Sequence, residues 1–149
     1  MSIDQIFQLS NNLAMLGWLF LLIVPNWKWT AKIVIGIIVT ILAILYITFI
    51  VQAMNPEDMR SFGTLEGIME LFTNKKAVFA GWLHYLAFDL MVGIFIVNDA
   101  ARSKVNRFLV IPCLLLTFML GPTGLLLYLI IRWIRTRKYF VEPGTPASA

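Results

Sequence analysis

The sequence predicts an all-α polytopic membrane protein: a bundle of four transmembrane helices with a short amphipathic interfacial helix between spans two and three. Hydrophobic residues make up 60% of the 149 residues and only 13% are charged. The mean hydropathy is +0.83. A soluble domain is nearer 45–50% apolar and about 25% charged. The apolar residues also fall into runs of about 20, the length that a helix needs to cross a bilayer.

The net charge of +4 and the pI near 9.5 do not indicate nucleic acid. The Lys and Arg residues lie beside apolar runs, where the positive-inside rule places them, and no basic patch is interleaved with aromatic residues. We therefore predict no nucleic-acid partner. Cys113 lies in an apolar run, so we expect a small buried side chain and no internal disulfide.

The first two spans are expected over residues 5–24 and 31–54. The first lacks a basic leading segment and a small-residue cleavage site, so we interpret it as a retained span and not as a signal peptide. The second is rich in Ile and Val, but an unpaired strand would leave its backbone polar groups unsatisfied in hydrocarbon, so helix is the expected state. Residues 64–72 are amphipathic and predict the short interfacial helix, with a lid over a lateral entrance as an alternative role.

Spans three and four are expected over residues 77–97 and 108–131. Pro122 interrupts the last span after Gly121 and should kink the helix there. Ordinary helix packing and the shaping of a pocket opposite span three both explain this pair of residues. The chain is thus predicted to form one four-span membrane domain over residues 1–138, with a flexible tail over 139–149.

Four spans place both termini on the same side of the membrane. That side would carry seven Lys and Arg residues and the opposite side five. The excess of basic residues predicts cytoplasmic termini, in a bacterial inner (plasma) membrane.

His84 and Asp89 make span three the candidate site. An ionisable side chain at mid-membrane depth costs roughly 2.5–3.5 kcal/mol on insertion scales and marks a functional site by default. On a helix the two side chains diverge by about 140° and lie about 7–8 Å apart along the axis, so we expect no direct hydrogen bond. They are instead predicted to flank one cavity, with Tyr85 one turn before Asp89.

A helical projection of residues 81–99 separates two sides. One side is purely aliphatic and is expected to meet lipid, whereas the polar and aromatic side chains are expected to turn inward to the bundle. The aliphatic side comprises Leu83, Leu86, Ala87, Leu90, Ile94 and Val97.

The most specific sequence pattern is Gly81-Trp82-x-His84-Tyr85-Leu86-Ala87-Phe88-Asp89-Leu90-x-Val92-Gly93, followed in the last span by Gly121-Pro122-x-Gly124. With it, the chain resembles the abscisic-acid-deficient-four-like membrane family over about residues 5–138. Plant members of that family are linked to neoxanthin formation from violaxanthin, a carotenoid epoxide. The resemblance implies an isomerase that needs no redox cofactor and acts on a carotenoid or another isoprenoid dissolved in the bilayer.

The same resemblance implies roles for individual residues. Asp89 and His84 would share the acid and base roles, with Tyr85 as an auxiliary donor. The residues implied to bind substrate are Trp82, Phe88, Asp99, Gly121 and Pro122, with Asp99 orienting the substrate at the interface. A single histidine without a second ligand at helical spacing predicts no metal site.

Three other interpretations remain open. His84 and Asp89 could form an interhelical hydrogen-bond clamp with Asn, Thr or Gln side chains of other spans. The protein could be a non-catalytic lipid-binding module or an accessory subunit of another membrane enzyme. A small transporter or proton-coupled channel is the third. The lipid bilayer is the expected partner in every case, and the sequence leaves an oligomer open.

Overall fold

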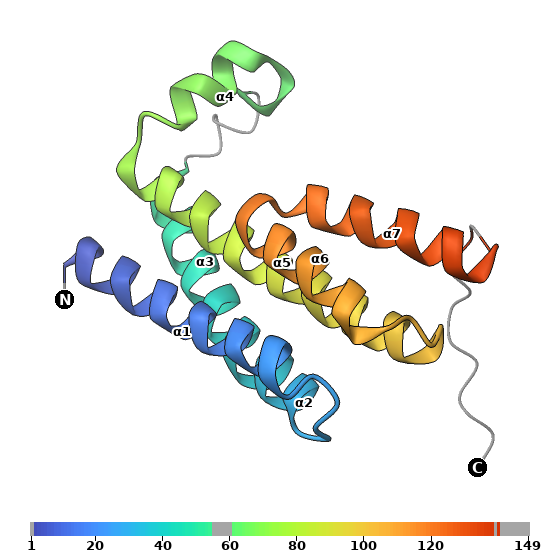
Figure 1. The fold of residues 1–149 in the computed structure, drawn as a ribbon. Helices are drawn as coiled ribbons and strands as arrows, with labels where there is room; N and C mark the ends of the chain where they lie inside the picture. The colour runs from blue at the N-terminus through green and yellow to red at the C-terminus, as the bar shows by residue number, and fades with distance from the viewer. Residues whose placement is uncertain (1, 55–60, 139, 141–149) are drawn as a thin grey trace.

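The computed structural model describes residues 2–54, 61–138 and 140, and this part of the chain is helical without strands (Figure 1). The all-α prediction is therefore confirmed for these residues. The tail expected over 139–149 lies outside them, apart from residue 140. In chain order the helices are α1 (Ile3–Ile23), α2 (Thr30–Ile33), the π-helical segment η1 (Val34–Val39), α3 (Thr40–Ala53), α4 (Leu65–Leu71), α5 (Lys75–Arg102), α6 (Arg107–Leu120) and α7 (Pro122–Thr136).

Three helices are long and apolar enough to cross a membrane: α1, the continuous helix of α2, η1 and α3 over Thr30–Ala53, and α5. Helix α1 begins with a capping box, in which the backbone N–H of Gln5 donates to Ser2 Oγ and that of Ser2 donates to Gln5 Oε1. The next helix is tied to the end of α1 by Thr30 Oγ1, which donates to the carbonyl of Val24 at 2.6 Å. The membrane class predicted from composition is supported by these three helices.

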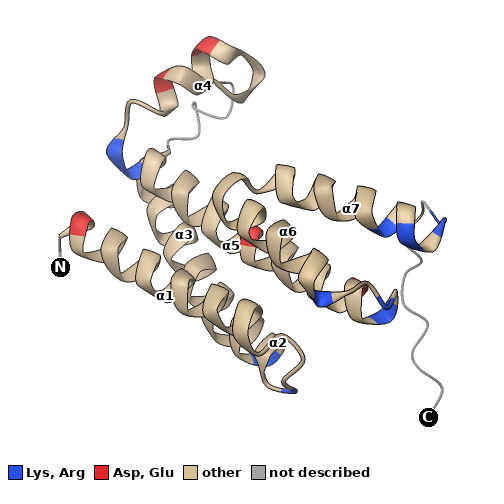
Figure 2. Ribbon diagram, in the orientation of Figure 1, with Lys and Arg blue, Asp and Glu red and all other residues tan. Residues whose placement is uncertain are grey.

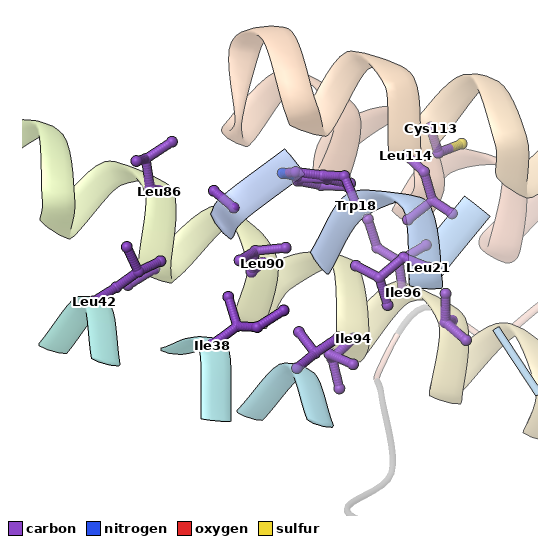
Figure 3. Close-up of a cluster of buried hydrophobic side chains, with 14 of the residues drawn as sticks. Trp18, Leu21, Ile38, Leu42, Leu86, Leu90, Ile94, Ile96, Cys113 and Leu114 are labelled. Atoms are coloured by element: carbon purple, nitrogen blue, oxygen red, sulfur yellow. The ribbon is translucent and has the colours of Figure 1, made fainter. Parts of the chain in front are cut away.

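Helix α5 is the centre of the bundle, and its aliphatic side faces the other helices. The six aliphatic residues expected to meet lipid are all buried, with Leu83 and Leu90 fully inaccessible. They pack against side chains of α1 and α3 such as Trp18, Leu21 and Leu42 (Figure 3). The expected lipid contact is therefore wrong. Lipid tails are as apolar as leucine, so hydrophobic periodicity identifies the two sides of a helix but not which side its neighbours cover.

The single fourth span expected over residues 108–131 is replaced by a helical hairpin. Helix α6 ends at Leu120, the chain reverses at Gly121, and α7 runs back along α6 (Figure 1). Gly121 has φ +38°, a value that a residue with a side chain rarely adopts, and Pro122 occupies the first turn of the new helix. At Gly124 a Cβ atom would overlap the backbone of Thr117, so the two helices are in very close contact.

Neither arm of the hairpin has the length of a span. Helices of 14 and 15 residues are about 21–22 Å long, against a hydrocarbon core of about 30 Å. Because the Gly-Pro pair produces a reversal and not a kink, the expected four-span count is not confirmed.

The reversal places the start of α1 and the end of α7 at opposite ends of the bundle (Figure 1). The start of α1 lies beside the start of α5, where Lys75 Nζ pairs with Asp4 Oδ1 at 2.8 Å. We call this the N-terminal end. At the other end, Arg107 Nη2 at the start of α6 donates to the carbonyls of Leu22 and Ile23 in α1. Helix α7 finishes at that second end, so the fold does not support the expectation of both termini on one side.

Candidate functional site at the tip of the hairpin

Asp89 lies halfway along α5, and its carboxyl group packs directly against the reversal at Gly121. A Cβ atom on Gly121 would be 2.7 Å from Asp89 Oδ1, so only glycine leaves room for this carboxyl group. Asp89 is 7% exposed, and its Oδ2 atom has no hydrogen-bond partner among the described residues. Buried polar atoms in native proteins are nearly always hydrogen-bonded, so an unpaired buried carboxyl oxygen is a candidate for a functional role.

Tyr85 lies one helical turn before Asp89 and contacts the last turn of α6. Its hydroxyl group donates to the carbonyl of Met119 at 3.2 Å, with the carbonyl of Phe118 at 3.5 Å. The last four carbonyls of a helix lack partners within that helix, so Tyr85 satisfies part of the α6 terminus. Trp82 stacks on Tyr85, and its indole Nε1 donates to Asn11 Oδ1 of α1 at 2.8 Å. These contacts join α5 to α1 and to the hairpin.

The N-terminus of α7 meets the same point from the other arm of the hairpin. No side chain caps it, and its first helical residue is Pro122, which has no backbone N–H. The first turn of a helix carries a partial positive charge that favours an anion nearby. A buried carboxyl group, the hydroxyl group of a half-buried tyrosine and an uncapped helix N-terminus therefore gather at one place. Such a set of groups can exchange a proton with a ligand and stabilise negative charge on an oxygen atom.

His84 lies on the other flank of α5. Its ring stacks on Phe88 with centroids 4.3 Å apart and lies 5.7 Å from the Tyr46 ring of α3. As the helical spacing predicts, His84 and Asp89 are not hydrogen-bonded to each other. Phe88 was expected to turn inward, but its side chain is 59% exposed on the outside of the bundle.

A mostly apolar cavity of about 140 Å³ adjoins His84, between α3 and α5. Helix α4 covers it: Ile68, Leu71 and Phe72 contribute to its wall, whereas Leu65 and Met69 are exposed. The expected amphipathic helix is thus present, and it occupies the position that a lid would take. Asp89 does not line this cavity. The full lining comprises Tyr46, Ile50, Met54, Phe62, Ile68, Leu71, Phe72, Ala77, Gly81 and His84.

Asp99 belongs to a separate buried cluster near the end of α5. Its Oδ2 atom accepts hydrogen bonds from Arg132 Nε at 2.7 Å and from the Tyr128 hydroxyl. The ion pair is almost fully buried and joins α7 to α5. Ten residues, or about 15 Å of helix, separate Asp99 from Asp89. The carboxyl group expected to orient substrate is therefore held by an arginine of the hairpin.

Sequence reasoning missed Tyr128 and Arg132. An arginine at the end of an apolar helix is typical of a residue that reaches toward the membrane surface. Its pairing with Asp99 depends on the reversal at Gly121, because only a returning helix brings residue 132 to the level of residue 99. Among the described residues, no three His, Cys, Asp or Glu side chains are grouped in a way that suits a metal ion.

Comparison with known protein families gives a match over most of the chain. A family model described as ABA DEFICIENT 4-like matches residues 5–128 of the 149. The matched range includes the whole of α5 and α6, the turn at Gly121 and the first seven of the 15 residues of α7. No curated protein and no solved structure matches the chain.

Proposed function

The chain belongs to the ABA DEFICIENT 4-like family, and we propose that it binds a carotenoid or another bilayer-dissolved isoprenoid and isomerises it by proton transfer at Asp89. Its three long apolar helices fit a membrane protein of this family. The observation that supports the catalytic proposal is the buried Asp89 Oδ2 atom, which lacks a partner among the described residues. We expect the protein in a bacterial inner membrane.

The proposed reaction on an epoxide conserves atoms and electrons. A base removes a proton from a C–H group, and the electron pair of that bond forms a new carbon–carbon double bond, giving an allene. The adjacent epoxide C–O bond breaks, and an acid protonates the oxygen to give a tertiary alcohol. Substrate and product are isomers, so no oxidant or reductant takes part. General acid–base groups typically accelerate such steps by about 10²–10⁴-fold.

We assign the proton-transfer roles to Asp89 and Tyr85. They lie one turn apart on α5, beside Gly121 and the end of α6. His84 lies on the flank of α5 that faces Tyr46 and α4, so we assign it to binding of the ligand chain and not to the reacting atoms. This division revises the His84–Asp89 acid–base pair that the sequence predicts.

The test uses the full chain reconstituted in lipid vesicles with violaxanthin, the epoxide to which the family resemblance points. Chromatography would follow formation of the allenic isomer. We expect Asp89→Asn, which keeps the shape that packs against Gly121, to lower the rate by about 10²–10⁴-fold. The matched control is Asp4→Asn, which makes the same change at an exposed carboxyl group and should retain the rate. Unchanged conversion by Asp89→Asn would contradict the proposed role of the carboxyl group.

A second candidate function is lipid binding without catalysis, alone or as an accessory subunit of another membrane enzyme. The apolar cavity between α3, α4 and α5 favours it, because that cavity accommodates part of an isoprenoid chain next to the imidazole of His84. Mass spectrometry of lipids extracted from the purified protein distinguishes the two candidates. A bound isoprenoid without turnover supports this second function, and absence of both isoprenoid and turnover contradicts both.

A further inference from the structure

We infer that the α6–α7 hairpin is re-entrant and that the basic end of the bundle is the cytoplasmic surface, which contacts anionic lipid headgroups. In this arrangement three helices cross the membrane, and α6 and α7 enter and leave on the same side. The N-terminus then lies on the opposite, non-cytoplasmic side.

The contacts that hold the start of α6 and the end of α7 indicate that the hairpin is re-entrant. Arg107, at the start of α6, hydrogen-bonds to carbonyls at the end of α1, and Arg132, near the end of α7, pairs with Asp99 near the end of α5. Helices α1 and α5 both finish at this end of the bundle. The turn at Gly121 is instead level with Asp89, in the middle of α5. Helix α6 therefore begins, and α7 finishes, at the same end of the bundle, and the two arms meet at a point halfway along α5.

The distribution of Lys and Arg residues indicates which end of the bundle faces the cytoplasm. With the hairpin re-entrant, nine of the 11 Lys and Arg residues that the structure describes belong to one end of the bundle, and Lys75 and Lys76 belong to the N-terminal end (Figure 2). Arg60, the twelfth basic residue, lies outside the described residues. The basic end comprises Lys28, Lys32, Arg102, Lys104, Arg107, Arg132, Arg135, Arg137 and Lys138.

A ratio of nine to two predicts orientation far more strongly than the six to five that the same residues give in a four-span chain. Short loops rich in Lys and Arg remain in the cytoplasm during insertion. The cytoplasmic leaflet carries anionic lipids, and its negative surface potential attracts basic groups beside a span. The acidic residues Asp4, Glu66 and Glu70 lie at the N-terminal end, which strengthens the asymmetry (Figure 2). Charge complementarity thus identifies anionic headgroups as the partner of the basic end.

Cysteine labelling of the full chain in intact bacterial cells tests the inference. Cys113 is fully buried, so the native chain serves as the unlabelled control. Three single variants introduce an exposed cysteine: Asn26→Cys in the loop after α1, Glu70→Cys on α4, and Arg135→Cys near the end of α7. A membrane-impermeant maleimide is applied before and after permeabilisation. A fluorescent protein fused after Ala149, which matures only in the cytoplasm, reports the C-terminal side independently.

We expect Glu70→Cys to react in intact cells, and Asn26→Cys and Arg135→Cys to react only after permeabilisation, with a fluorescent C-terminal fusion. Reaction of Arg135→Cys together with Glu70→Cys, on the side opposite Asn26→Cys, would overturn the re-entrant hairpin in favour of four spans. Reaction of Asn26→Cys and Arg135→Cys in intact cells, with Glu70→Cys protected and a dark fusion, would overturn the orientation and its anionic-lipid contact.

Discussion

Two ion pairs of the same chemistry differ sharply in environment, and this difference sets how much each stabilises the fold. The side chains of Asp99 and Arg132 are 10% and 7% exposed, whereas those of Asp4 and Lys75 are 74% and 66% exposed. Solvent screens the outer pair, which is worth at most about 1 kcal/mol. Removing one member of the inner pair leaves a buried charge without its partner.

We therefore expect Asp99→Asn to lower the free energy of unfolding by about 3–5 kcal/mol and Asp4→Asn by at most about 1 kcal/mol. Thermal unfolding of the detergent-solubilised protein measures both. The double variant Asp99→Asn/Arg132→Met should recover much of the loss, because it also removes the stranded charge. Equal destabilisation by the two aspartate variants would contradict a buried clamp between α5 and α7.

Gly124 provides a second test at the level of single residues. A Cβ atom there would overlap backbone atoms of Thr117 and Cys113, which cannot move away as a flexible side chain can. We expect Gly124→Ala to lower the free energy of unfolding by about 1–3 kcal/mol through overpacking. Gly36→Ala is the matched control, since no atom lies within 4 Å of its added Cβ. Similar melting temperatures for the two variants would contradict the close hairpin.

Among the elements, α4 differs from the rest because it touches the bundle mainly through the wall of one cavity. Filling that cavity from α4 should displace whatever occupies it. We expect Ile68→Trp to reduce the amount of co-purified isoprenoid severalfold, as quantified by mass spectrometry. Met69→Trp adds the same side chain on the exposed side and should leave the amount unchanged. A similar loss in both variants would indicate a general effect on α4 and not a filled cavity.

The three long helices could be predicted from the sequence, and the hairpin could not. The spans expected over 5–24, 31–54 and 77–97 overlap α1, the continuous helix over 30–53 and α5 closely, because hydropathy over 20 residues reports helices that cross a bilayer. The last apolar run has the length of one span, and a Gly-Pro pair inside it is equally compatible with a kink and a reversal. Only contacts between residues far apart in the sequence distinguish a kinked span from a reversal.

The candidate site, like the fold, was predictable only in part. An aspartate inside an apolar helix is conspicuous, and the Gly121-Pro122 pair was expected opposite it, where Gly121 indeed lies. The outward position of Phe88 was not predictable, because it depends on which side of α5 the neighbouring helices cover. The partners of Asp99 were hidden for a different reason, since Tyr128 and Arg132 come within reach only after the chain has turned back.

For the whole molecule, the separation of charge between the two ends predicts a dependence on lipid composition. Each basic residue near an anionic surface contributes about 1 kcal/mol of attraction, and salt screens it. We expect a higher melting temperature in vesicles containing phosphatidylglycerol than in phosphatidylcholine alone, with the difference shrinking at high salt. Lys28→Gln/Lys104→Gln should reduce the difference more than Lys75→Gln/Lys76→Gln, which alters the N-terminal end. An equal reduction would contradict a preferred anionic surface at the basic end.

A re-entrant hairpin that stops at the level of Asp89 would also occupy the two leaflets of the bilayer unequally. Neither arm of the hairpin, α6 or α7, lies beside α5 between Gly121 and the N-terminal end, so lipid of that leaflet would approach the turn. In the other leaflet the two arms themselves would take the place of lipid. A hydrophobic substrate dissolved in the leaflet at the N-terminal end would therefore approach the turn at Gly121, against which Asp89 packs, without crossing the bilayer midplane, whereas one in the opposite leaflet would first have to flip. Turnover would then depend on the leaflet into which the substrate is delivered.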